Sequence, residues 1–189
     1  PPVQVYAIAP DFALTRIAGR LFGKMTSLQP PDTHHLAAAE GWLGLGNPAE
    51  AGKELEQISA PVRLHPEVLQ VRYHLYEATR QWELAAETAQ GICQQLPEVS
   101  FGWIHQAYAL HELKRTREAF QVLRPVLDSF PEEHIIPYNL ACYACQLGNA
   151  QEALDWLHKA IALAGAQEIK KMALSDPDLQ PLRAEIERF

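Results

Sequence analysis

Hydrophobic and polar positions within residues 100–133 follow the period of an α-helix in two successive stretches. Trp103, Ala107 and Leu110 recur at i, i+4 and i+7, a spacing that places them on one helical face. Ala119, Leu123 and Val126 repeat this pattern after the polar stretch 114–117. The pattern predicts two helices joined by a turn, and the small residues at 107 and 119 allow their backbones to approach closely.

The same pattern returns at a fixed interval along the chain. Its central alanine stands at Ala51, Ala85, Ala119 and Ala153, in steps of 34 residues. Four residues later the chain carries Leu55, Ala89, Leu123 and Leu157, and Pro97 and Pro131 close the second and third units. One helical hairpin cannot bury its apolar face alone, so repeated hairpins are expected to stack into a solenoid.

This interval resembles the tetratricopeptide repeat, whose 34 residues carry an opening aromatic, a tyrosine and a central alanine. Trp103 matches the aromatic, Tyr76 matches the tyrosine, and Tyr73 departs from the pattern because it stands where a small residue is usual. The resemblance implies an all-α fold: a right-handed α-solenoid of four helix–turn–helix units at 32–65, 66–99, 100–133 and 134–167. A capping helix is expected at 168–189.

Two prolines predict local helix geometry beyond the repeat itself. Pro177 follows Ser175 and Asp176, so a helix is expected to begin there with one of these two residues as its cap. Leu179, Leu182 and Ile186 then form an apolar stripe that can cover the last repeat. Pro125 lies inside the second helix of the third unit and is expected to kink it.

The resemblance implies that the first helices of the units line a concave surface that holds peptides. Residues of these helices that do not belong to the core pattern are the candidate peptide contacts, with Tyr108 and Tyr138 expected to be exposed beside Asn139. The alternative interpretation of this surface is a solvated polar helix face. The candidates are His74, Glu77, Phe101, His105, Tyr108, His111, Tyr138, Asn139 and Cys142.

Charge on this surface predicts the chemistry of the partner. Family members that bind acidic chaperone tails use lysine, arginine and asparagine, whereas Ile104 and Tyr108 occupy such positions here and only Asn139 matches. The surface is rich in histidine and acid, so the expected partner is a protein or peptide that is neutral or basic and partly apolar. The function predicted is a noncatalytic interaction scaffold or adaptor.

The pair Cys142 and Cys145 suggests a second function class, a metal or redox site. Redox dithiols sit at a helix start, where amide dipoles lower the thiol pKa, but this pair falls in the middle of a predicted helix. His105 and His111 could face the sulfurs, yet no second cluster at zinc spacing follows. We therefore predict no metal and no cofactor, and no catalytic residues.

Composition excludes several other classes of protein. The chain has 189 residues, 48% hydrophobic, with a net charge of −7, which argues against a disordered chain and against nonspecific nucleic-acid binding. Apolar runs are too short to span a bilayer. Three cysteines make no disulfide framework, which favours a reducing, cytoplasmic setting. The Asp-Pro-Asp-Leu stretch at 176–179 resembles the closing segment of many bacterial members of the tetratricopeptide-repeat family, so the resemblance implies a bacterial-type protein.

Charge also separates residues 1–31 from the rest. Arg16, Arg20 and Lys24 against Asp11 give this segment +2, which leaves −9 for residues 32–189. Its apolar residues recur at helical spacing, so it is expected to cap the first repeat, to occupy an acidic groove of its own or a neighbouring chain, or to be a leader. The second of these makes a self-associating structural module the main alternative function, with homo-oligomers joined through 1–31.

Overall fold

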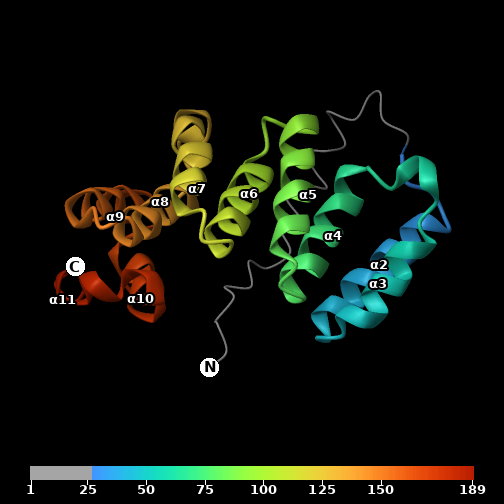
Figure 1. Cartoon of the computed structure of the whole chain (residues 1–189), viewed down its shortest axis with the longest axis horizontal. Coiled ribbons are helices and arrows are strands. Elements are labelled where there is room, and N and C mark those ends of the chain that lie inside the picture. The colour runs from blue at the N-terminus through green and yellow to red at the C-terminus, as the bar shows by residue number, and fades with distance from the viewer. Residues whose placement is uncertain (1–26) are drawn as a thin grey trace.

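The computed structural model describes residues 27–189, and within this range every regular element is a helix. The helices follow one another along the long axis of the molecule, from α2 at one end to α10 and α11 at the other (Figure 1). The predicted all-α solenoid is confirmed. Consecutive helices pack in pairs: α2 (Asp32–Gly44) on α3 (Pro48–Gln57), α4 (Pro66–Ala78) on α5 (Trp82–Gln95), α6 (Ser100–Glu112) on α7 (Thr116–Leu123), and α8 (Ile135–Gln146) on α9 (Ala150–Ala164).

The turn inside each pair uses one residue with a left-handed backbone conformation. These residues are Gly46, Arg80, Lys114 and Gly148, with φ between 55° and 84°, and they lie 34 positions apart. The following amide bonds back to a carbonyl five residues earlier, as Gln81 N–H does to Tyr76 at 2.8 Å, which is the bond that ends a helix in a Schellman motif. Arg80 and Lys114 adopt this conformation at a cost of roughly 1 kcal/mol each, because a Cβ crowds the backbone there.

Small side chains bring the helices together, as the sequence predicts. The repeated alanines are completely buried: Ala39, Ala107 and Ala141 in the first helices, and Ala51, Ala85, Ala119 and Ala153 in the second helices. Tyr73 is the exception, and its ring is also completely buried. α4 and α6 approach each other much less closely than α2 and α4 or α6 and α8 do, because the Tyr73 ring fills the space between them.

α6 packs closely on α5 instead of on α4. A Cβ at Gly102 would lie 2.8 Å from Cys93 Sγ and 2.9 Å from the Cys93 backbone nitrogen. Only glycine fits at this crossing without a shift of one helix.

The buried apolar side chains fall into separate groups. One lies around α2, α3 and α4, a small one lies around Tyr73, and a large one runs from Ile104 to Ile186.

Pro125 changes the second helix of the third pair as expected, but it does more than kink it. The α-helix ends at Leu123, and the chain continues as the 3-10 helix η2 (Arg124–Ser129). Proline lacks the backbone N–H that an α-helical bond would need, and the tighter 3-10 winding accommodates it near its start. α7 is therefore shorter than α9, which has no internal proline.

The C-terminal cap consists of α10 (Ala166–Ser175), the 3-10 helix η3 (Pro177–Leu182) and the short α11 (Arg183–Ile186). Asp176 caps η3 by accepting the Asp178 N–H at 2.9 Å, with Pro177 in the first turn. Leu179, Leu182 and Ile186 are buried, as the apolar stripe predicts. The cap thus covers the end of the solenoid with an interrupted chain of helices.

Most of the segment 1–31 lies outside the described residues, so the expectations for it stay predictions. α2 begins at Asp32, directly after Pro30 and Pro31. Leu28 packs against the apolar group of the first helix pair. None of the helices between residues 27 and 189 combines the length and the apolar character that crossing a bilayer requires.

Candidate functional site

The first helices of the pairs, α2, α4, α6 and α8, form one side of the solenoid, which we call the inner face. Arg72 is the only lysine or arginine in these four helices. The carboxylates of these four helices are Asp32 at the start of α2, Glu40, Glu67, Glu77 and Glu112. Burial and the neighbouring Glu67 raise the pKa of Glu40, an effect that the nearby His74 opposes. The inner face is therefore acidic, as the sequence predicts.

An aromatic cluster occupies the inner face between α4 and α6. The ring of His105 lies 4.0 Å from that of Phe101 and 4.5 Å from that of Tyr73, measured between centroids. His74 closes the group, 5.7 Å from both Phe101 and His105. His105 is buried, and its Nδ1 has no hydrogen-bond partner among residues 27–189. Burial lowers the pKa of His105 to about 3, so its imidazole is neutral at physiological pH.

Tyr108 lies on α6, in the third helix pair, and is half-buried. Its ring meets that of Trp82 edge to face, 5.7 Å away. Burial raises the pKa of the Tyr108 hydroxyl, and the charges of Glu112, Glu77, Asp176 and Asp178 raise it further. The four carboxylates come from α4, α6 and the C-terminal segment, so negative charge from three parts of the fold acts on this hydroxyl.

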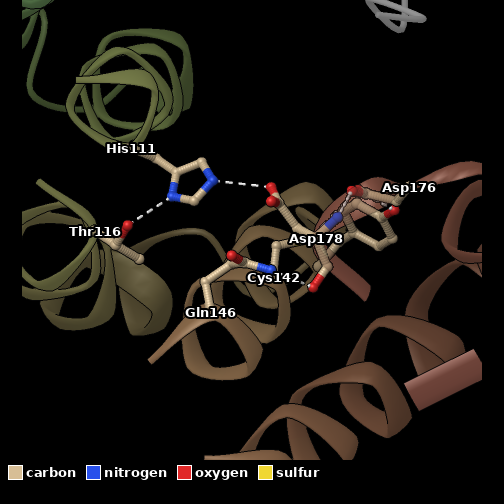
Figure 2. Close-up of polar contacts among 7 residues, drawn as sticks. His111, Thr116, Cys142, Gln146, Asp176 and Asp178 are labelled. Atoms are coloured by element: carbon tan, nitrogen blue, oxygen red, sulfur yellow. Dashed lines mark hydrogen bonds and ion pairs between the residues drawn. The ribbon is translucent and has the colours of Figure 1, made fainter. Parts of the chain in front are cut away.

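The α8 end of the inner face is covered by the chain itself. Asp176 accepts hydrogen bonds from the Tyr138 hydroxyl at 2.8 Å and from the Cys142 thiol at 3.4 Å. Gln146 donates its side-chain N–H to the Asp178 backbone carbonyl at 2.8 Å. Figure 2 shows these contacts converging on the short segment between Asp176 and Asp178.

His111 joins this network from α6. Its Nε2 lies 2.8 Å from a carboxylate oxygen of Asp178, and its Nδ1 lies 3.0 Å from the Thr116 hydroxyl (Figure 2). In the tautomer that donates Nε2–H to Asp178, Nδ1 accepts the hydroxyl proton of Thr116. His111 is only 4% exposed, so water cannot pair its ring nitrogens. The two contacts pair both of them inside the protein.

The candidate contacts fall into two groups. His74, Glu77, Phe101, Tyr108 and Asn139 are partly exposed, whereas His105, His111, Tyr138 and Cys142 are buried. The expectation that Tyr138 is exposed is wrong, because it is 3% exposed beneath the C-terminal segment. Burial of Leu179 and Leu182 draws η3 onto α8, and Asp176 comes to lie over the Tyr138 hydroxyl as a consequence.

Cys142 and Cys145 are both buried free thiols in α8. Burial and the charges of Asp176 and Asp178 raise the pKa of each, the opposite of what a reactive thiolate requires. Within the part of the chain that the structure describes, no group of His, Cys, Asp and Glu side chains has an arrangement that could hold a metal ion. These observations give the metal or redox alternative no support.

Sequence reasoning missed the part that the C-terminal segment plays here. It expected a terminal stretch to cover the last repeat, but it did not place Asp176 and Asp178 beside α6 and α8. It also missed Tyr143, which stacks against His111 with centroids 5.0 Å apart. The signal available in the sequence was the apolar stripe of Leu179 and Leu182 beside these two carboxylates.

Comparison with solved structures gives the same fold for several helical proteins. A tetratricopeptide-repeat protein of Thermus thermophilus, TTC0263, superposes with a TM-score of 0.64 at 18% identity, over 83% of this chain and 84% of that one. MamA from Desulfovibrio magneticus RS-1 (residues 41 to the end) gives 0.65 at 17% identity, over 86% and 98%. MamA of strain MSR-1 gives 0.60 at 22% identity, over 68% and 74%.

Sequence comparison adds no closer relationship. No family model matches the chain, and no curated protein matches it. The structural matches show that the helices are arranged as in tetratricopeptide-repeat proteins, so the fold inferred from the 34-residue spacing is confirmed.

Proposed function

We propose that this chain is a noncatalytic interaction scaffold that holds a peptide segment of a partner protein along its inner face. The proposal depends on one observation: the face combines partly exposed aromatic rings with carboxylates and almost no basic side chains. Such a surface offers apolar contact area together with negative charge. The partner segment is therefore neutral or basic and partly apolar, and no nucleic acid is bound.

Tyr108, Phe101 and His74 supply the apolar contact area, and Glu77 and Glu112 supply the charge. Asn139 on α8 is partly exposed and can donate and accept hydrogen bonds to a peptide backbone. His105, His111, Tyr138 and Cys142 support this surface from below, since each is buried. The free, buried thiols fit a reducing, cytoplasmic setting.

A peptide array probed with the purified 189-residue chain tests the proposal. Peptides with basic and apolar residues should be retained, and raising the salt concentration should weaken their binding. Tyr108→Ala should lose most of this binding. Glu87→Ala, an exposed position on α5, is the matched control and should bind as the unaltered chain does. Binding that is indifferent to Tyr108→Ala, or confined to acidic peptides, would sink the proposal.

Charge opposition favours a second candidate function, self-association through residues 1–31. That segment carries +2 and the remainder of the chain −9. The 189-residue chain should then have the mass of an oligomer in solution, whereas a chain without residues 1–24 should have the mass of a monomer and a lower melting temperature. The same number of chains per particle and the same melting temperature in both would remove this candidate and leave peptide binding untouched.

A further inference from the structure

A groove of about 400 Å³ lies between α7 and α9, the second helices of the third and fourth pairs. α7 packs on α6 and α8, and α9 packs on α8, so a space remains between the two second helices. We call it the outer groove, and its lining residues are Arg117, Phe120, Gln121, Leu147, Asn149 and Glu152. None of them belongs to α2, α4, α6 or α8, so this surface is separate from the inner face.

The outer groove combines apolar contact area with an arginine that has no partner. Phe120 and Leu147 are both partly exposed. Arg117 is exposed and makes no ion pair within residues 27–189, whereas the nearby Arg115 pairs with Glu118 at 2.6 Å. The one carboxylate in the lining belongs to Glu152 and accepts a hydrogen bond from the Asn149 side chain at 3.3 Å.

Positive charge continues beyond the groove, one turn further along both helices. Arg124 follows Gln121 by three residues and Trp156 follows Glu152 by four, so each lies beside a lining residue on the same helical face. The guanidinium carbon of Arg124 lies 5.4 Å from the centre of the Trp156 ring, and Lys159 Nζ lies 4.1 Å from it. Both cations are exposed, and neither makes an ion pair within the described part of the chain.

The charge of this surface is opposite to that of the rest of the molecule. Arg117, Arg124 and Lys159 stand against the single carboxylate of Glu152, whereas residues 32–189 together carry −9. Arg124 and Lys159 repel each other across one indole ring, and a carboxylate bound to them would remove this repulsion. The surface is therefore complementary to an anionic ligand with an apolar part.

The spacing of the cations fits an extended peptide. Arg117 and Arg124 are two helical turns apart, which is about 10 Å along the axis. An extended chain covers about 10 Å in three residues. A segment with two carboxylate side chains three residues apart can therefore reach both arginines, and an apolar side chain between them lies over Phe120 and Leu147.

We infer that the outer groove binds an acidic segment of a partner protein, with one carboxylate on Arg117, a second on Arg124 and Lys159, and an apolar side chain between them. The guanidinium fork of arginine matches the two oxygens of a carboxylate. This inference is independent of the proposed function, because it concerns other residues and a ligand of opposite charge.

Fluorescence polarisation of labelled peptides against the 189-residue chain tests the inference. The probe is the acetylated, amidated hexapeptide Gly-Glu-Leu-Ala-Glu-Gly, and its control has glutamine in place of both glutamates. The glutamate peptide should bind, and raising the salt concentration should weaken its binding. No binding of the glutamate peptide, or equally tight binding of the glutamine peptide, would overturn the inference.

A charge-matched pair of variants locates the binding. Arg117→Gln combined with Arg124→Gln should weaken binding of the glutamate peptide roughly tenfold. Lys171→Gln combined with Arg188→Gln removes the same charge from exposed positions in the C-terminal cap and should bind normally. Equal losses in both double variants would mean that only the overall charge matters, and unchanged binding in the first would exclude the groove.

A direct readout comes from the indole N–H resonances of the ¹⁵N-labelled chain. The glutamate peptide should shift the resonance of Trp156 and leave those of Trp42 and Trp82, which belong to the first two helix pairs, in place. An unshifted Trp156 resonance at saturation would contradict the inference.

The two proposals can fail separately. Tyr108→Ala should leave binding of the glutamate peptide unchanged, because Tyr108 lies on α6 and does not line the outer groove. Loss of glutamate-peptide binding in that variant would place the acidic ligand on the inner face and overturn the outer groove. Tyr108-dependent binding of basic peptides would support the inner face alone.

Discussion

His111 and Asp178 lie 2.8 Å apart, although 67 residues separate them in the chain. Their contact joins α6 of the third helix pair to η3 at the C-terminus, and both of these elements also pack on α8. The C-terminal segment is thus held by side chains from two helix pairs. A capping element in a solenoid would need contact with only the last pair.

The first prediction concerns this contact. Asp178→Ala leaves the buried His111 without its acceptor, and the free energy of unfolding should fall by about 1–3 kcal/mol. Urea denaturation of the 189-residue chain measures the change. Glu187→Ala removes a similar carboxylate from an exposed ion pair with Arg183 at 3.1 Å, and it should cost under about 1 kcal/mol. Equal losses in both variants would show that the contact to His111 adds nothing.

The second prediction concerns pH. The pKa of His105 is about 3 in the folded chain, whereas unfolded histidine titrates near 6.5. Between these values the unfolded chain binds a proton that the folded chain does not. The free energy of unfolding therefore falls as pH falls, by up to about 1.4 kcal/mol per pH unit from this group alone.

His105→Phe keeps a ring against Phe101 and cannot be protonated. Its stability should consequently fall less than that of the unaltered chain when the pH is lowered from about 6.5 to about 4.5. Thermal melts of both proteins across this interval measure the difference. Parallel curves would mean that His105 is protonated in the folded chain or titrates normally there.

The third prediction concerns the crossing of α5 and α6. Gly102→Ala places a Cβ 2.8–2.9 Å from atoms of Cys93, so one helix must shift, and stability should fall by about 1–3 kcal/mol. Gly91→Ala on α5 is the control, because its Cβ would lie 3.8 Å from the nearest atom, Leu69 Cδ1. That variant should gain up to about 1 kcal/mol from better helix propensity. A stability loss of equal size in both variants would contradict the close approach.

The fourth prediction concerns the thiols. Burial raises the pKa of Cys93 to about 12 and also raises those of Cys142 and Cys145. A thiol reagent at neutral pH should therefore modify the folded chain slowly and all three cysteines quickly after denaturation. Rapid labelling of Cys142 in the folded chain, or one equivalent of zinc in the purified protein, would restore the metal or redox alternative.

The repeating part of the fold could be predicted because it follows from local requirements. The alanines at 51, 85, 119 and 153 mark points where two backbones meet, and every unit has the same steric need. The turn conformation at Arg80 and Lys114 was less visible, since neither residue is glycine. Their 34-residue spacing from Gly46 and Gly148 was the available signal.

The site could be predicted only in part, because burial on the inner face depends on contacts between distant segments. Tyr108 and Glu77 lie on the partly exposed surface as their helical positions suggest. Tyr138 does not, because its exposure depends on the path that the chain takes after Ser175. His105 is buried because Tyr73 of another helix pair provides a ring beside it, and no local pattern encodes that pairing.

The division of the apolar core has a consequence for how the molecule opens. The group around Tyr73 contains few side chains and borders an imidazole nitrogen that lacks a partner within residues 27–189. This small group separates the apolar group around α2, α3 and α4 from the large group from Ile104 to Ile186, and α5 links the two sides because it packs on both α4 and α6. Backbone amides of α2, α3 and α4 should then exchange with solvent faster than those of α8 and α9, as in a protein made of two cooperative units.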